Sequence, residues 1–304
     1  MRPILPWALA AAVTCSSCFV ANAFRAPFVP PHPPPRTLPK ELGSKGARIA
    51  VAWIGHATAL VQLDDKVVLF DPVFTETVGL LSRRTVALPI DPRDLPPLDA
   101  VLVSHMHFDH FSLGSIEMIQ DKIRRFYAPE GGLVYLTDFS FDAYDVPQWA
   151  TKGEGGLEIT AVPVKHNGMR YGADIGWMHA YTGWIVRYHG LTVYFGGDTA
   201  YDGPHFRETG ARFPRIDVAL LPIAPIHPRS LMGGMHMEPY EAITAMDDLG
   251  ALRMVPVHYD TFFNSLDGKK EPLDSLMRAM RMRELDESRV IAMEIGEERV
   301  ILAK

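Results

Sequence analysis

The chain has 304 residues, of which 47% are hydrophobic and 22% are charged, a composition that suits a globular protein with a sizeable core. Its formal net charge is -6, and acidic and basic residues are mixed along its length. Because no basic block is present, nothing in the sequence favours a nucleic-acid partner, and the acidic balance indicates only solubility.

The first 23 residues have the pattern of an export signal. Arg2 precedes the apolar stretch 4–13, which Pro6 interrupts, and the small residues 21–23 follow as a cleavage site. The apolar stretch is too short to span a bilayer comfortably. We therefore expect an exported protein, either periplasmic or anchored on the non-cytoplasmic side of a membrane.

Cys15 and Cys18 are the only cysteines of the chain. Cleavage after Ala23 would leave a mature protein with neither disulfides nor thiolate metal ligands. The alternative is a lipidated Cys18, since Ser16-Ser17-Cys18 partly resembles a lipid-attachment site, although Cys15 stands where such sites have a large aliphatic residue. Both outcomes place the chain outside the cytoplasm.

A proline-dense segment follows the signal. Residues 24–47 contain the run APFVPPHPPPRTLPK, which predicts an extended, poorly packed tether with a solvent-exposed His32. Residues 48–304 then predict a single folded domain, because neither a repeat of fixed period nor a second boundary interrupts them.

The domain contains several β-like runs with helical segments between some of them. The predicted strands are 48–55, 58–63, 67–71, 100–104, 157–164, 183–190, 191–196, 217–223, 253–258, 288–294 and 298–303, and the predicted helices are 115–123, 239–250 and 272–285. This order predicts an α+β fold in which two mixed β-sheets have helices outside them.

The end of the apolar run 100–103 carries the stretch SHMHFDH. In extended backbone, side chains two positions apart share a face, so His105 and His107 are placed to bind one ion. Asp109 has the same parity, and a turn would bring His110 beside it to bind a second ion. Imidazole and carboxylate ligands indicate zinc, with manganese or iron as alternatives.

Three further candidate ligands also follow β-like runs: His166, Asp198 and His258. Loops at strand ends are where such scaffolds usually place their chemistry. Asp198 comes after Gly196-Gly197, which permits a close approach of the backbone, and its carboxylate is suited to bridging two cations.

This ordered set resembles the metallo-β-lactamase superfamily, whose signature is H-x-H-x-D-H followed by a separate His, Asp and His. The resemblance covers residues 48–303 and implies a four-layer αββα sandwich of two mixed β-sheets flanked by helices. It also implies two zinc ions, the first held by His105, His107 and His166, the second by Asp109, His110 and His258, with Asp198 as the bridge.

A narrower resemblance is to the branch that contains N-acylphosphatidylethanolamine phospholipase D and its bacterial relatives. It rests on WIGHATALVQ, LFDPVF, LPPLDAVLVSHMHFDH, VYFGGDTAYDGPHFRETGARFPRIDVALLPI and MHMEPYEA. True β-lactamases often have a cysteine where this chain has Asp198, so antibiotic hydrolysis is disfavoured, whereas a site of oxygen and nitrogen ligands suits phosphate esters. The stretches HYDTFF and IHPRSLM depart from the branch where a substrate would be selected.

These features predict a phosphodiesterase of phospholipase D type, acting on a small molecule or a phospholipid, in which two cations turn a shared water into a hydroxide nucleophile. Asp109 would orient that hydroxide, and by resemblance His236 would contact the substrate oxyanion or the leaving group; otherwise His236 is an exposed loop histidine. Asp71 either holds a metal-bound histidine or only forms a turn, and His56 either lines the pocket or caps a turn.

Two other functions stay open at this point. Hydrolysis of a lactone or carboxylic ester is one, because sugar-phosphate lactonases share GHAT-like openings and the same ligands. A non-catalytic exported metal-binding protein is the other, and the complete ligand set argues against it. Membrane association would arise through a phospholipid substrate or a lipidated Cys18.

Overall fold

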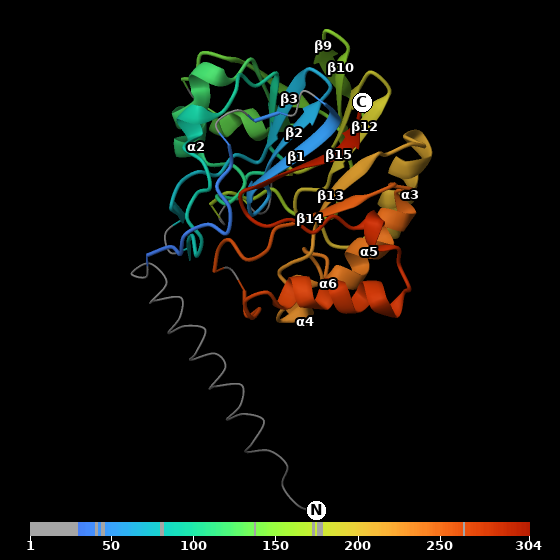
Figure 1. Ribbon diagram of the computed structural model, residues 1–304. Helices are drawn as coiled ribbons and strands as arrows, with labels where there is room; N and C mark the ends of the chain where they lie inside the picture. Colours follow the sequence, from blue (N-terminus) through green and yellow to red (C-terminus); the bar gives the residue numbers. More distant parts are fainter. Residues whose placement is uncertain are drawn as a thin grey trace, which may run out of the picture.

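The computed structural model describes most of the chain after position 29 (Figure 1). The described residues are 30–39, 42–43, 46–79, 82–136, 138–171, 174, 179–263 and 265–304. The expected export signal 1–23, with Cys15 and Cys18, and the first part of the expected tether therefore lie outside the described residues. Signal cleavage and lipidation stay predictions.

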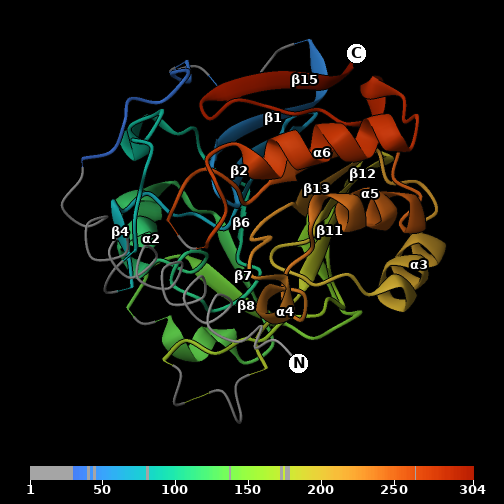
Figure 2. The same cartoon turned by 90° about the horizontal axis from the view of Figure 1, so that it is seen from below.

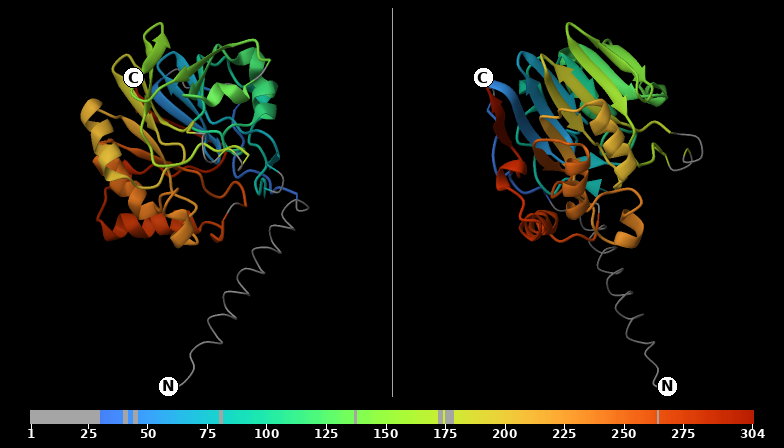
Figure 3. Two further views of the ribbon diagram at one scale, coloured as in Figure 1. Left: turned by 180° about the vertical axis from the view of Figure 1, so that it is seen from behind. Right: turned by 90° about the vertical axis from the view of Figure 1, so that its right-hand side faces the viewer.

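Within the described residues, seven strands form a first, mixed sheet in the order β15-β1-β2-β3-β6-β7-β8. β15, β1, β2 and β3 pair antiparallel, whereas β6, β7 and β8 continue from β3 in parallel. The strands are β1 (Ala47–Gly55), β2 (Thr58–Leu63), β3 (Lys66–Phe70), β6 (Ala100–Leu102), β7 (Arg125–Pro129), β8 (Asp142–Val146) and β15 (Glu297–Ala303). Because β15 pairs with β1, the two ends of the domain lie side by side (Figure 3).

The described residues also form a second sheet of six strands, in the order β14-β13-β12-β11-β10-β9. β12, β13 and β14 are parallel, and the other neighbours are antiparallel. The strands are β9 (Thr151–Glu154), β10 (Leu157–Val162), β11 (Gly183–Tyr188), β12 (Leu191–Phe195), β13 (Val218–Pro222) and β14 (Met254–Val257), and a separate short pair is formed by β4 (Thr77–Val78) and β5 (Ser82–Arg83).

Helices cover the outer faces of both sheets. The helix α2 (Leu113–Ile119) lies on the side of the first sheet, and α3 (Gly203–Arg212), α5 (Pro239–Asp248) and α6 (Glu271–Met282) lie together on the side of the second (Figure 2). The remaining helical turns among the described residues are α4 (Arg229–Met232) and 3₁₀ turns at Pro92–Asp94, Gln120–Lys122, Gly132–Tyr135 and Glu287–Arg289. This is the four-layer arrangement of two mixed sheets and flanking helices that the sequence predicted.

Local sequence signals explain where the flanking helices begin. The side chain of Ser112 accepts the N–H of Ser115 at the start of α2, and that of Asp202 accepts the N–H of His205 at the start of α3. At the start of α5, Glu238 and Glu241 form a reciprocal capping box. Each cap satisfies backbone N–H groups that would otherwise have no partner inside the helix.

The two sheets pack against each other through large apolar side chains. Trp53 of β1 and Trp184 of β11 are both buried, and the rings of Phe70 in β3 and Phe195 in β12 stack with their centroids 4.5 Å apart. Every residue of β6 and of β13 is buried. Their continuous apolar sequences reflect this burial on both faces of a sheet.

Most predicted elements are present, and one predicted strand is wrong. At residues 288–294, only a 3₁₀ turn at Glu287–Arg289, capped by the side chain of Asp286, and a single bridge between Val290 and Met254 are present, and residues 291–294 have no regular structure. The strands β7, β8 and β9 and the helix α3 were not predicted. β9 is exposed throughout and β8 is mostly half-buried, and neither has the apolar alternation by which strands are found.

Residues 30–39, hereafter the N-terminal strap, are mostly exposed, but backbone hydrogen bonds attach them to the domain. The N–H of His32 donates to the carbonyl of Thr85 (2.9 Å), and the N–H of Ala87 donates to the carbonyl of His32 (2.8 Å). Leu38 is buried. The His32 side chain is exposed, as expected. Prolines lack the N–H that strand pairing needs, so the strap is attached through its few other residues.

Candidate metal centre

The candidate ligands stand in loops that follow four strands. Four of them follow β6, and the others follow β10, β12 and β14. In that order they are His105, His107, Asp109 and His110, then His166, Asp198 and His258. The structure brings all seven together at one edge of the sandwich, in contacting groups.

The loop after β6 is held in shape by hydrogen bonds that sequence reasoning missed. The N–H groups of His110 and Phe111 donate to the carbonyl of His107, at 3.1 and 2.8 Å. Nη1 of the buried Arg170 donates to the carbonyls of Met106 and Phe111, at 3.0 and 2.8 Å. No local pattern signals this arginine contact, because it joins two separate loops.

His105, His107, His166 and Asp198 form the first ligand group, in which one ligand atom from each residue lies within 4.8 Å of the others. His107 Nδ1 is 2.9 Å from His105 Nε2 and 3.4 Å from His166 Nε2. Asp198 Oδ2 is 3.9 Å from each of these Nε2 atoms. Three imidazoles and a carboxylate are a donor set that suits a tetrahedral zinc ion.

The second ligand group contains Asp109, His110, His258 and also His56, with ligand atoms again within 4.8 Å of one another. Asp198 lies between the two groups. Its Oδ1 is 3.0 Å from His258 Nε2, and its Oδ2 is 3.2 Å from His110 Nε2. A carboxylate that faces both groups is where a bridging ligand would stand.

Gly197 explains how the Asp198 carboxylate comes so close to the loop after β6. Its φ is +56°, and a Cβ added there would overlap the side chain of Ser104. Any larger residue would therefore be strained and would push β12 away from β6. The sequence pointed to this close approach through the pair Gly196-Gly197.

The second ring nitrogen of four candidate histidines faces an acceptor. Such contacts decide which nitrogen keeps its proton and which is free to bind a metal. The pairs are His105 Nδ1 with Ser104 Oγ (2.9 Å), His107 Nε2 with Asn167 Oδ1 (3.0 Å), His110 Nδ1 with Asp71 Oδ2 (2.6 Å) and His166 Nδ1 with the carbonyl of Met235 (3.0 Å). In all four histidines, the ring nitrogen that does not contact the acceptor is the one that faces the ligand group.

Two residues whose roles the sequence left open make direct contacts to ligands. Asp71 is fully buried and accepts from the N–H and the hydroxyl of Ser104, both at 2.7 Å, besides facing His110. His56 Nε2 is 3.1 Å from Asp109 Oδ2. Asp71 thus does more than form a turn, and His56 lies inside the candidate centre.

His236 also belongs to the centre and is no exposed loop histidine. It forms a third group with Asp198 and His258, and its Nδ1 is 3.6 Å from Asp198 Oδ2. Its side chain is 12% exposed, against 1% for His258, so it stands on the more open side of the site.

Apart from His110, the ligands whose pKa is shifted have the protonation states that metal binding requires. Burial lowers the pKa of His56 and of His166 to about 3, which leaves both imidazoles neutral. Burial would raise the pKa of Asp198, but the imidazoles of His258 and His110 hold it well below its usual value. His110 differs: burial lowers its pKa, but the carboxylates around it, first that of Asp198, raise it well above normal. Neutral imidazoles and ionised carboxylates are the forms that bind metals.

Unsatisfied atoms show that the residues fit a pair of cations. In the described part of the chain, His110 Nε2, His258 Nε2 and Asp198 Oδ1 are buried and make no hydrogen bond. Each such atom costs about 1–3 kcal/mol when it is left without a partner. A divalent cation on each side of Asp198 would satisfy all three.

The fold and the grouped ligands define the class of protein. The β-lactamase superfamily domain family matches residues 66–259. The chain belongs to the metallo-β-lactamase superfamily, and its family and its buried His/Asp site make it a metal-dependent hydrolase.

Similar proteins refine this class. An uncharacterised protein of Mycobacterium tuberculosis is 31% identical over 268 residues, covering 82% of this chain and 69% of that protein. N-acyl-phosphatidylethanolamine-hydrolyzing phospholipase D 1 of Caenorhabditis elegans is 28% identical over 266 residues, covering 81% and 74%. Igni18, a metallo hydrolase of Ignicoccus hospitalis, shares the fold with a TM-score of 0.64 at 22% identity, covering 83% of this chain and 97% of Igni18.

No helix in the described part of the chain has the length and apolar character that crossing a bilayer requires.

Proposed function

We propose that the chain hydrolyses phosphodiesters, in the manner of a phospholipase D, with two zinc ions held by the two ligand groups. The observation that carries this proposal is a donor set of nitrogen and oxygen atoms only, in two groups joined by Asp198. Such ligands keep a cation hard enough to attract phosphate oxygens. The name of the C. elegans relative, at 28% identity, supports the choice of a phosphodiester substrate.

Bound in these groups, two divalent cations would supply Lewis acidity and lower the pKa of a water molecule toward neutrality. The chain's own side chains would supply orientation. Asp109 is held by His56 at 3.1 Å, so its carboxylate has a fixed direction within the site. His236, beside Asp198 on the open side, is placed to donate a hydrogen bond to a phosphoryl oxygen or to the leaving group.

A direct comparison of substrate classes tests the proposal. Protein of measured metal content would be assayed with bis-p-nitrophenyl phosphate and with a panel of lactones and carboxylic esters. We expect the higher kcat/KM on the phosphodiester. A higher kcat/KM on a lactone or carboxylic ester would favour the ester-hydrolase alternative instead. Two bound ions without turnover of any substrate would favour a non-catalytic metal-binding protein.

His107→Ala sharpens this test, because it removes a nitrogen from the centre of the first ligand group. Turnover should fall below detection while the far-UV circular dichroism spectrum is unchanged. The matched control is His189→Ala, since His189 is an exposed histidine in the turn between β11 and β12. Full turnover in His107→Ala would refute the proposed site.

We also propose that the protein acts outside the cytoplasm. The supporting features are the charged, apolar and small-residue segments of positions 1–23. Mass spectrometry of the mature chain distinguishes the two routes: a first residue at position 24 indicates cleavage after Ala23, and a lipid-modified Cys18 indicates an anchor. A chain that retains Met1 in the cytoplasm would contradict both.

A further inference from the structure

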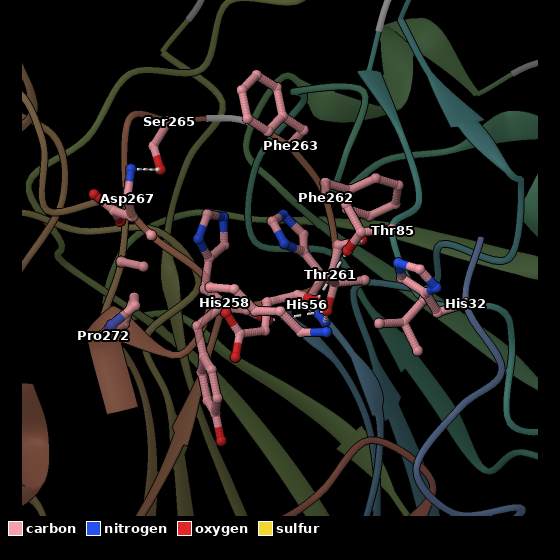
Figure 4. Close-up of a pocket in the computed structure, with 16 residues that line it drawn as sticks. His32, His56, Thr85, His258, Thr261, Phe262, Phe263, Ser265, Asp267 and Pro272 are labelled. Atoms are coloured by element: carbon pink, nitrogen blue, oxygen red, sulfur yellow. Dashed lines mark hydrogen bonds between the residues drawn. The ribbon is translucent and has the colours of Figure 1, made fainter. Parts of the chain in front are cut away.

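A pocket of about 310 Å³ lies beside the second ligand group (Figure 4). It reaches His56 and His258, which are each only 1% exposed, so the pocket ends against the candidate centre. Much of its lining is apolar or aromatic and comes from segments far apart in the sequence. These residues are Val86, Ala224, Tyr259, Phe262, Phe263 and Pro272.

The N-terminal strap forms part of the pocket wall and is connected to His56 through Thr85 and Thr261, whose hydroxyl accepts the N–H of His56 at 2.6 Å. The N–H of His32 donates to the carbonyl of Thr85, and the N–H of Thr85 donates to the carbonyl of Thr261 (2.8 Å). The N–H of His258 donates to the carbonyl of His56 (2.9 Å). Figure 4 shows His32 and Thr85 on one side of His56 and His258. The strap is thus a fixed part of this wall.

The charges around the pocket do not favour an anionic occupant. Asp260, Asp267 and Lys269 line it, so two carboxylates stand against one ammonium group. Both Asp267 oxygens already accept backbone N–H groups, at 2.7 and 2.8 Å, and one Asp260 oxygen accepts another at 3.0 Å. A second negative charge on the substrate would meet these carboxylates at close range.

We propose that this pocket binds the organic substituent that remains on the phosphate during hydrolysis, and that this substituent is compact, largely apolar and free of negative charge. The inference rests on the proposed phosphodiesterase function and restricts it to small diesters, because the diacylglycerol group that a phospholipase D leaves on the phosphate would exceed this pocket. His236, the candidate contact of the leaving group, is not among the lining residues, so the leaving group is directed elsewhere.

The pocket volume sets the size limit. If each non-hydrogen group takes about the 30 Å³ share of a water molecule, about ten such groups fill the pocket. A phenyl ring fits within that limit, whereas a biphenyl group or a hexadecyl chain exceeds it. His32 is an exposed lining residue contributed by the strap, so a smaller side chain there would enlarge the pocket on its solvent side.

A series of p-nitrophenyl phosphodiesters with one leaving group tests the pocket. The second substituent would be methyl, phenyl, 4-carboxyphenyl, biphenyl or hexadecyl. We expect kcat/KM for the phenyl ester to exceed that for the methyl ester at least about tenfold, because an apolar pocket gains about tenfold or more from such added groups. The 4-carboxyphenyl, biphenyl and hexadecyl esters should each fall well below the phenyl ester.

His32→Ala tests whether the strap limits the size of the pocket. The ratio of kcat/KM for biphenyl over phenyl should rise at least about fivefold in this variant, and His189→Ala, an exposed histidine outside the pocket, should keep the wild-type ratio. An unchanged ratio in His32→Ala would remove His32 from the proposal. Equal rates across the series, or a hexadecyl ester that is the best substrate, would overturn the pocket. If no ester at all is hydrolysed by protein with two bound ions, the proposed function itself fails.

Discussion

Asp71→Asn tests the geometry of the second ligand group, because a single carboxylate holds both the loop and a ligand. Asp71 accepts two hydrogen bonds from Ser104 and faces Nδ1 of His110 at 2.6 Å. An amide in its place would turn an N–H donor toward Nδ1 of His110. The imidazole would then keep its proton on Nε2, the nitrogen that faces Asp198.

The expected magnitudes follow from these contacts. A hydrogen bond to a charged group contributes about 1.5–3 kcal/mol, so the free energy of unfolding of the metal-free protein should fall by about 2 kcal/mol. Loss of the acceptor behind a ligating histidine typically weakens metal binding about 10- to 100-fold. We therefore expect this loss for the second ion, whereas the affinity for the first ion should change by less than about threefold.

The assay is a chelator-competition titration of metal-free protein, combined with urea unfolding. Asp217→Asn is the matched control, because Asp217 is also buried and accepts the N–H of Thr192 at 2.9 Å, and its charged neighbour is Arg215 and not a candidate ligand. The control should lose stability and keep both metal affinities. Wild-type affinity for the second ion in Asp71→Asn, or an equal loss in the control, would refute this account of Asp71.

Three further predictions concern the surroundings of the ligands. His56→Ala removes the partner of Asp109 and should weaken the second ion about 10- to 100-fold by titration, and His56→Gln, which keeps an N–H donor, should recover part of that loss; equal affinities in both variants would contradict a positioning role. Arg170→Ala leaves two loop carbonyls without their donor and should lower the free energy of unfolding in urea by about 2–4 kcal/mol. A loss under about 1 kcal/mol would show that the loop after β6 keeps its shape without the arginine. Burial lowers the pKa values of His56 and His166 to about 3, whereas in the unfolded chain they are about 6.5. As pH falls from 7 to 5 the unfolded chain therefore binds more protons than the folded one, and each histidine lowers the free energy of unfolding by up to about 2 kcal/mol. Calorimetry should then give the metal-free protein a lower melting temperature at pH 5 than at pH 7. The raised pKa of His110 has the opposite effect, but it concerns one histidine against two. A higher melting temperature at pH 5 would contradict the prediction.

The sequence pointed to candidate ligands that the structure groups together, because their chemistry is local. His105, His107 and Asp109 alternate in one short loop, and the pair Gly196-Gly197 before Asp198 indicated a close backbone approach. The strands with strong apolar patterns were found for the same reason. Residue type and spacing over a few positions carried these predictions.

Contacts between distant segments were beyond the sequence. The roles of Asp71 and His56 stayed open because their partners lie 39 and 53 positions away. Arg170 gave no signal, since its two acceptors are carbonyls of another loop. The attachment of the N-terminal strap depends on hydrogen bonds to the backbone of Thr85 and Ala87, which composition does not reveal.

The most direct measurement is the number of metal ions bound per chain, with Asp198→Ala beside the wild type. If one carboxylate joins two ligand groups, elemental analysis of dialysed wild-type protein gives two ions per chain, and X-ray absorption shows a metal–metal distance with only nitrogen and oxygen ligands. The variant should then lose affinity for both ions together. A single ion in the wild type, or a variant that still binds two with unchanged affinity, would contradict a shared centre.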